Sequence, residues 1–139
     1  MSDIEIKVVI GNPPNNIRES LDTLFPHDLT PIYTFGDTIY NPHQVDLTAD
    51  LVAHERVHMA QQGNAPAKWW WDYIHDAEFR FKAELQAYHT QYLIAKNVIK
   101  DRNDLARYLH AIASDLSSPM YGELCSHSAA LKHIRLGVV

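Results

Sequence analysis

The residues best suited to chemistry in this sequence are two histidines separated by one helical turn, with a glutamate beside the first. His54, Glu55 and His58 form the pattern H-E-x-x-H. On a helix the two imidazoles lie on one side, about 40° apart, so both can bind one ion. Glu55 lies about 100° from His54 around the helix, where it can reach a water molecule on that ion. The pattern predicts a metal site with a general base beside it.

A catalytic zinc site needs a third protein ligand, and Glu84 is the strongest candidate. It falls within the apolar stripe of the next predicted helix, close in angle to Phe81 and Tyr88. A carboxylate among aromatic side chains requires a partner, and a metal ion is a suitable one. Other candidates on the same helix are Asp76, Glu78 and His89.

The same residues also have an interpretation without a metal. The histidines can be core residues that hydrogen-bond to buried polar groups, because they lie on the apolar face predicted for their helix. That face comprises Leu47, Leu51, His54, Val57, His58 and Gln61. Glu84 can be a buried carboxylate that pairs with Arg80 or another basic group.

Positioning the three ligands requires two helices that pack together, and the sequence predicts several. A strand over 4–10 and a bent strand or small hairpin over 32–40, with a turn at Gly36-Asp37, precede the helices. We expect helices over 17–25, 46–62, 66–99 with a kink near His75-Asp76, 103–116 and 126–134. Strands and helices that are segregated along the chain indicate the α+β class. The expected fold is a small N-terminal strand unit on a helical bundle.

Length and charge limit the classes of function. The 139 residues, 46% of them hydrophobic, suit a single domain over 1–139. The net charge of −5 shows no basic excess, so we expect no nucleic-acid binding. The lone Cys125 excludes an internal disulfide framework. The N-terminus lacks a signal-peptide pattern and no apolar run approaches the ~18 residues of a membrane span, so we expect a cytoplasmic protein without a membrane partner.

The pattern H-E-x-x-H, followed by a glutamate on the next helix, resembles the gluzincin class of zinc metallopeptidases. More narrowly, it resembles the minimal members of that class and short H-E-x-x-H proteins of phages and bacteria. The resemblance covers about residues 31–92. It implies that His54, His58 and Glu84 bind Zn²⁺ within a zincin-like helical bundle. It also implies that an edge strand within 34–40 lies over the first helix and pairs with an extended peptide or protein substrate.

The resemblance also implies roles for residues around the metal. Glu55 would take a proton from the metal-bound water and pass it to the leaving amine. Tyr121, in the break over 117–122, is the candidate donor to the oxyanion, with His110 and His127 as weaker choices. The alternative for Tyr121 is an aromatic side chain that only packs at a turn. Members of the class often carry an acid four residues after the glutamate ligand, where this chain has Tyr88. Candidates to support the histidines in its place are Asp50 and Gln61.

Two functions compete for these residues. The first is a zinc-dependent metallopeptidase that hydrolyses peptide bonds through a metal-activated water with Glu55 as general base. The alternative is a zinc-stabilised binding or assembly protein without catalysis, such as a phage accessory factor. Small size and the run Trp69-Trp70-Trp71, of which one is expected to stay exposed, favour the alternative. A helical interaction domain without a metal is a third hypothesis.

Overall fold

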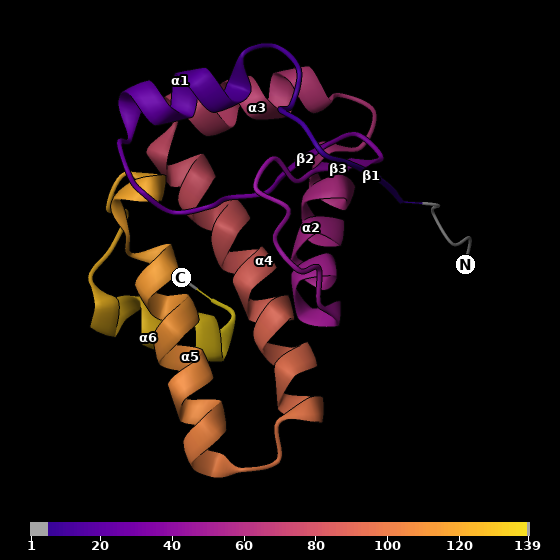
Figure 1. Ribbon diagram of the computed structural model, residues 1–139. Coiled ribbons are helices and arrows are strands. Elements are labelled where there is room, and N and C mark those ends of the chain that lie inside the picture. Colours follow the sequence, from indigo (N-terminus) through magenta and orange to yellow (C-terminus); the bar gives the residue numbers. More distant parts are fainter. Residues whose placement is uncertain (1–5, 139) are drawn as a thin grey trace.

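The computed structural model describes residues 6–138 and has a mixed α+β fold in which helices predominate (Figure 1). The strands are β1 (Lys7–Val9), β2 (Tyr33–Phe35) and β3 (Thr38–Tyr40). The helices are α1 (Ile17–Leu24), α2 (Ala49–Gln62), α3 (Pro66–His75), α4 (Ala77–Val98), α5 (Arg102–Leu116) and α6 (His127–Leu136), with a 3-10 turn η1 (Pro119–Tyr121) before α6. The predicted α+β class is confirmed. No helix within 6–138 is long and apolar enough to cross a membrane.

The sheet is small and has the strand order β1-β3-β2. β2 and β3 form an antiparallel hairpin in which Phe35 faces Thr38 across the turn. Gly36 in that turn has a φ of +64°, which glycine adopts without steric cost. The hairpin alternative is thus confirmed over the single bent strand. β1 pairs with β3 in parallel, which leaves β2 at the opposite edge.

The first strand is shorter and more exposed than its pattern suggests. Alternating apolar residues are typical of a half-buried strand. All three residues of β1 are nevertheless exposed, and Ile4 and Glu5 lie outside the described residues. The reason is that α2 packs against β2, which lies at the opposite edge of the sheet from β1. The side chains of β1 therefore remain at the surface.

α4 is the central helix and packs against α2, α3, α5 and α6 (Figure 1). The kinked helix predicted for 66–99 is instead two helices that meet at Asp76. This residue has extended backbone, with φ −126° and ψ 106°, and its side chain accepts a hydrogen bond from the N–H of Phe79 as the N-cap of α4. α2 begins at Ala49 rather than Asp46, with Thr48 in the N-cap position.

Two apolar clusters surround α4. One joins it to α5 and α6 and includes Leu85, Tyr92 and Leu116. The other joins it to α1, α3 and β2 and includes Ile17 and Trp70. The interface between α4 and α2 is different, because it carries buried polar side chains. That interface holds the candidate ligands.

Candidate metal centre

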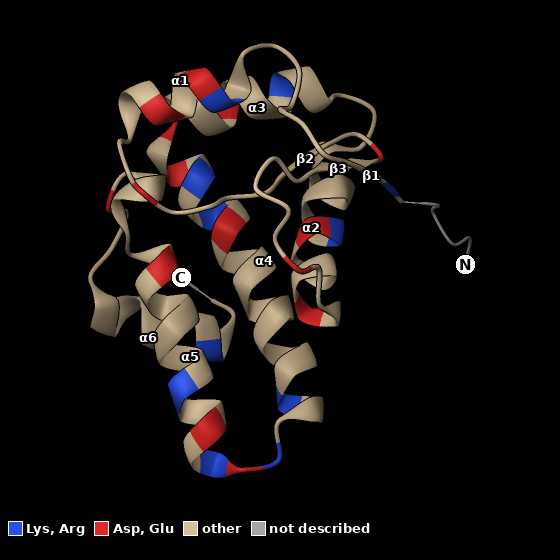
Figure 2. Ribbon diagram, in the orientation of Figure 1, with Lys and Arg blue, Asp and Glu red and all other residues tan. Residues whose placement is uncertain are grey.

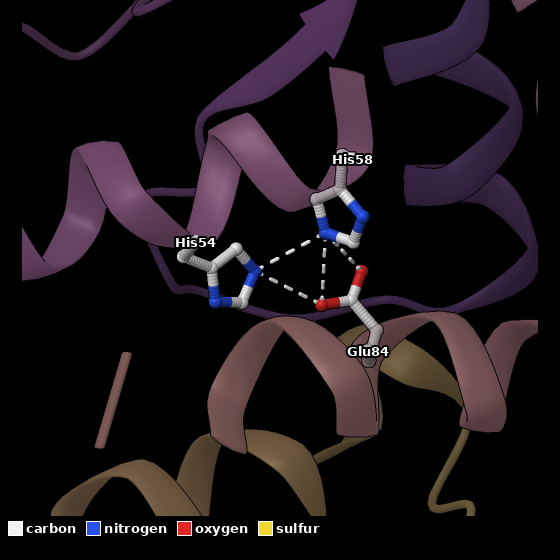
Figure 3. Close-up of side chains that lie close together, drawn as sticks. All are labelled: His54, His58 and Glu84. Atoms are coloured by element: carbon white, nitrogen blue, oxygen red, sulfur yellow. Dashed lines mark hydrogen bonds and ion pairs between the residues drawn. The ribbon is translucent and has the colours of Figure 1, made fainter. Parts of the chain in front are cut away.

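His54 and His58 on α2 face Glu84 on α4 across the helix interface (Figure 3). The histidines are each 5% exposed and the glutamate 3%. The two Nε2 atoms lie 3.2 Å apart, and Oε1 of Glu84 lies 3.1 Å from Nε2 of His54 and 3.3 Å from Nε2 of His58. Ligand atoms around a tetrahedral ion with bonds of about 2.0–2.1 Å are themselves about 3.3 Å apart. The structure thus brings the three predicted ligands together at a spacing that fits a metal ion.

A hydrogen-bond chain behind His58 fixes the position of its ring proton. Nδ1 of His58 lies 2.9 Å from Oε1 of Gln61, whose amide nitrogen donates to the carbonyl oxygen of Ala83 at 3.0 Å. Because that carbonyl oxygen can only accept, the Gln61 amide presents its oxygen to the imidazole. Nδ1 therefore carries the proton, and Nε2 presents a lone pair to the site.

A longer chain of hydrogen bonds fixes the ring proton of His54 on Nδ1. Its Nδ1 lies 2.8 Å from Oε1 of Gln91, whose amide nitrogen donates to the hydroxyl of Tyr108 at 2.9 Å. Tyr108 donates in turn to the carboxylate of Asp50. Burial raises the pKa of Asp50, but hydrogen bonds from Thr48 and Tyr108 outweigh it and lower the pKa, so the carboxylate is ionised and accepts. Nε2 of His54 is therefore also free to bind a cation.

Three atoms with lone pairs consequently converge without a hydrogen between them. The second oxygen of Glu84 is already engaged, because the Tyr73 hydroxyl donates to Oε2 at 2.6 Å. Buried acceptors this close require a cation among them. Burial lowers the pKa of His58, but the Glu84 and Glu55 carboxylates and the Gln61 acceptor together raise it to about 9. A proton on His58 thus satisfies the cluster when no metal is bound.

We predict opposite pH dependences for metal-free stability and for metal affinity. The raised pKa of His58 gives the metal-free protein stability that is complete below pH 6.5 and is lost as pH rises through about 9. Burial raises the pKa of Glu84, but His58 and His54 outweigh burial and lower the pKa overall. The stability that the Glu84 carboxylate contributes is therefore present above pH 4.5 and is lost as pH falls below it. Metal binding requires neutral imidazoles, so metal affinity should increase as pH rises toward about 9, where His58 loses its proton.

Thermal melts in chelator and metal titrations over this pH range measure the two trends. A metal-free melting temperature that rises between pH 6.5 and 9 would contradict the proton assignment for His58.

The side chains that support the histidines are partly those predicted. Gln61 contacts His58 directly, whereas Asp50 acts on His54 only through Tyr108 and Gln91. Gln91 was not among the predicted residues. It follows Glu84 by two helical turns on the same face of α4, and this spacing was the signal that could have identified it.

Replacing Gln91 with leucine should weaken metal binding by about 10–100-fold, because His54 loses the acceptor that holds its Nδ1 proton. Competition with a chromophoric chelator measures the Kd. Asn97→Leu is the matched control, since Asn97 is exposed on the same helix and should leave the Kd unchanged. Equal Kd values for Gln91→Leu and the native chain would contradict this role.

Glu55 lies beside the cluster but is not part of it. It is 4% exposed, and its Oε1 accepts a hydrogen bond from the Thr34 hydroxyl on β2 at 2.7 Å. Its Oε2 lies 3.7 Å from Nε2 of His54. Burial raises the pKa of Glu55, while both histidines and Thr34 oppose that rise. The carboxylate can thus act on a molecule bound at the cluster without being a ligand.

A cleft of about 150 Å³ adjoins the cluster, and Tyr121 lines it. The Tyr121 hydroxyl lies 2.8 Å from the hydroxyl of Tyr88, whose ring meets His54 edge-on with 4.5 Å between centroids. Burial raises the pKa of both phenols, so both keep their protons at neutral pH. The alternative donors His110 and His127 lie at the surface, with Nδ1 of His110 3.1 Å from Nε2 of His127, and they do not line the cleft.

The remaining candidate ligands serve other purposes. Asp76 caps α4, Glu78 forms an ion pair with Lys82 at 3.0 Å, and Nδ1 of His89 lies 2.6 Å from a main-chain carbonyl oxygen of α6. Arg80 forms no ion pair with Glu84 in the described part of the chain. Its guanidinium donates to the carbonyl oxygens of Tyr73 and Ile74 in the last turn of α3 and of Tyr121 in η1.

The buried face of α2 is more polar than predicted. It consists of His54, Glu55, His58, Met59 and Gln62, whereas Leu47, Leu51, Val57 and Gln61 are half-buried. Gln62, to which the sequence assigned no role, donates to the carbonyl oxygen of Thr34 at 2.6 Å and accepts from the N–H of Gly36 at 2.8 Å. Trp70 also donates to that carbonyl oxygen at 2.8 Å. Side chains thus hold β2 on α2 and occupy part of its edge.

The tryptophan run divides as predicted. Trp69 and Trp70 are buried, and Trp71 is 64% exposed.

Searches of protein-family models, of curated proteins and of solved structures returned no match to this chain. The case for a function therefore rests on the buried His-His-Glu cluster, which can bind a metal ion, and on the groups around it.

Proposed function

We propose that the protein is a zinc-dependent metallopeptidase that hydrolyses peptide bonds. The observation that carries this proposal is the buried carboxylate of Glu55. One of its oxygens is held by Thr34, and the other lies 3.7 Å from Nε2 of His54. A metal site that only stabilises a fold needs ligands, but it does not need an adjoining buried carboxylate that coordinates nothing.

The ligand set supports zinc as the metal. Two imidazole nitrogens and one carboxylate oxygen form a donor set of catalytic zinc sites, which keep the fourth position open for water. Both imidazoles present Nε2 because Gln61 and Gln91 accept the protons on Nδ1. A zinc ion bound there would lower the pKa of a bound water toward neutrality and polarise a substrate carbonyl.

The residues of the chain supply the proton transfers and the positioning. Glu55 accepts the proton of the attacking water and delivers it to the leaving amine nitrogen. Thr34 holds the Glu55 carboxylate in place through one oxygen and leaves the other for this exchange. The paired hydroxyls of Tyr88 and Tyr121 have one proton to spare after bonding each other, and they donate it to the substrate carbonyl oxygen.

A peptide mixture incubated with zinc-loaded protein tests this function. We expect new termini that mass spectrometry detects, that disappear when a chelator removes the metal and that return when zinc is restored. Absence of cleavage by protein that demonstrably holds zinc would overturn the proposal. The zinc-stabilised binding or assembly protein would then be the better account.

A further inference from the structure

The cleft beside the metal cluster is lined mainly by apolar and aromatic residues and by histidines, with three acidic side chains and with no lysine or arginine in the described range 6–138. Its carboxylates are those of Glu55, Glu84 and Asp115. Lysines and arginines are interspersed with acidic residues over other parts of the helices (Figure 2). A divalent ion offsets two of the three negative charges, so the metal-loaded cleft stays negative when all three carboxylates are ionised.

Asp115 is the carboxylate that neither the cluster nor the proton transfer uses. It lies in the last turn of α5, and its main-chain oxygen accepts bonds from the N–H and the hydroxyl of Ser118 at 3.1 and 2.7 Å. The backbone is thus fixed, while the half-buried carboxylate has no hydrogen bond or ion pair with a partner in residues 6–138. Asp115 is also outside the group of atoms close enough to share one metal ion.

The surroundings of Asp115 are unfavourable for a negative charge in the free protein. Its partial burial removes water and raises its pKa, and a charge on His54 opposes that rise. The last turn of a helix carries partial negative charge on its free carbonyl groups, and α5 has no basic residue there. A carboxylate in this position gains stability when a cation from outside the chain binds to it.

We propose that Asp115 binds a cationic group of the substrate, so that the cleft selects peptides with an ammonium or guanidinium group close to the bond held at the metal cluster. This inference rests on the proposed peptidase function and names its substrate class. The cation can come from a lysine or arginine side chain or from the free α-amine of a peptide, because both make the same ionic contact.

Synthetic peptides built around a bond that the zinc-loaded protein cleaves test this selection. One position at a time, within about three residues of that bond, is occupied by lysine, glutamine or glutamate. Each peptide is prepared with a free and with an acetylated N-terminus. We expect kcat/KM to be about 10–100-fold higher for the cationic peptide than for its neutral match. If acetylation abolishes the preference the cation is the α-amine, and if lysine-to-glutamine exchange abolishes it the cation is the side chain.

Asp115→Asn should reduce the preference to within about threefold, because it removes the charge and keeps the shape. The matched control is Asp104→Asn, the same change at an exposed position of α5 where Asp104 pairs with Arg107, and it should keep the full preference. Both variants should hold as much zinc as the native chain, since neither residue is a ligand.

The outcomes separate this inference from the function on which it rests. Cleavage without a charge preference, or a preference that survives Asp115→Asn, would overturn the role of Asp115 and leave the peptidase function standing. Failure of the zinc-loaded native protein to cleave any peptide would overturn the function, and the substrate class with it.

Discussion

Replacing Glu55 with glutamine should lower kcat for peptide hydrolysis by about 1,000-fold, within the range of about 10²–10⁴ that a general base contributes. Glutamine has nearly the same shape, and its carbonyl oxygen can accept the bond from the Thr34 hydroxyl that Glu55 accepts at 2.7 Å. It cannot take a proton from water. The loss should therefore fall on catalysis and not on folding. Steady-state kinetics with one cleaved peptide measure it.

The zinc content of Glu55→Gln provides the control for that experiment. Because Glu55 lies outside the ligand cluster, the variant should bind as much zinc as the native chain. Native activity in a zinc-loaded Glu55→Gln protein would contradict its role as general base. Full biological function of this variant without any proteolysis would favour the binding or assembly protein.

Zinc should raise the melting temperature of the native chain by about 10–20 °C and should leave that of Glu84→Gln almost unchanged. A ligand that binds only the folded state and is present at about a thousand times its Kd raises the free energy of unfolding by about 4 kcal/mol. For a domain of this size, that gain in free energy corresponds to a rise in melting temperature of about 10–20 °C. Glutamine keeps the shape of the side chain that Tyr73 contacts, but it removes the charged oxygen that faces both histidines.

Glu78→Gln is the matched control for the melting experiment. Glu78 lies on the same helix, is exposed and pairs with Lys82 at 3.0 Å, away from the cluster, so this variant should show the native response to zinc. Equal zinc shifts for Glu84→Gln and the native chain would contradict the role of Glu84 as a ligand. Differential scanning fluorimetry in chelator and in zinc gives both values.

The cluster of candidate ligands could be predicted because the position of each member depends on spacing within one helix. The separation of four residues places His54 and His58 on one face of α2, and the position of Glu84 in an apolar stripe places it toward the interior of α4. Gln91 obeys the same rule and could have been identified in the same way. Local periodicity therefore contains most of the information about the cluster itself.

The groups around the ligands could not be predicted in this way. Tyr73 reaches Glu84 from α3, and Thr34 reaches Glu55 from β2. These contacts depend on how α3 crosses α4 and on how the hairpin lies over α2, and no pattern within one element encodes either. Asp115 adjoins the cleft for the same reason, because the packing of α5 brings it there.

Sequence periodicity also gave a wrong helix boundary where one apolar repeat runs through two helices, α3 and α4. The apolar repeat over 66–99 continues through Asp76, so it does not distinguish a kinked helix from two helices. The break depends on an aspartate that caps the second helix through the N–H of Phe79. In the alternative interpretation without a metal, Glu84 pairs with Arg80 or another basic group. Arg80 is not that partner, because main-chain carbonyl oxygens, which sequence patterns do not reveal, satisfy its guanidinium, and the basic groups beside Glu84 are His54 and His58.

The decisive experiment on the His-His-Glu cluster is the metal content of the purified chain, measured by elemental mass spectrometry beside His54→Ala and Glu84→Ala. We expect about one zinc per native chain and none in either variant, because each substitution removes one of three converging ligand atoms. A native chain that holds no metal after dialysis against zinc would contradict it. His54, His58 and Glu84 would then be a hydrogen-bonded core cluster that a shared proton satisfies.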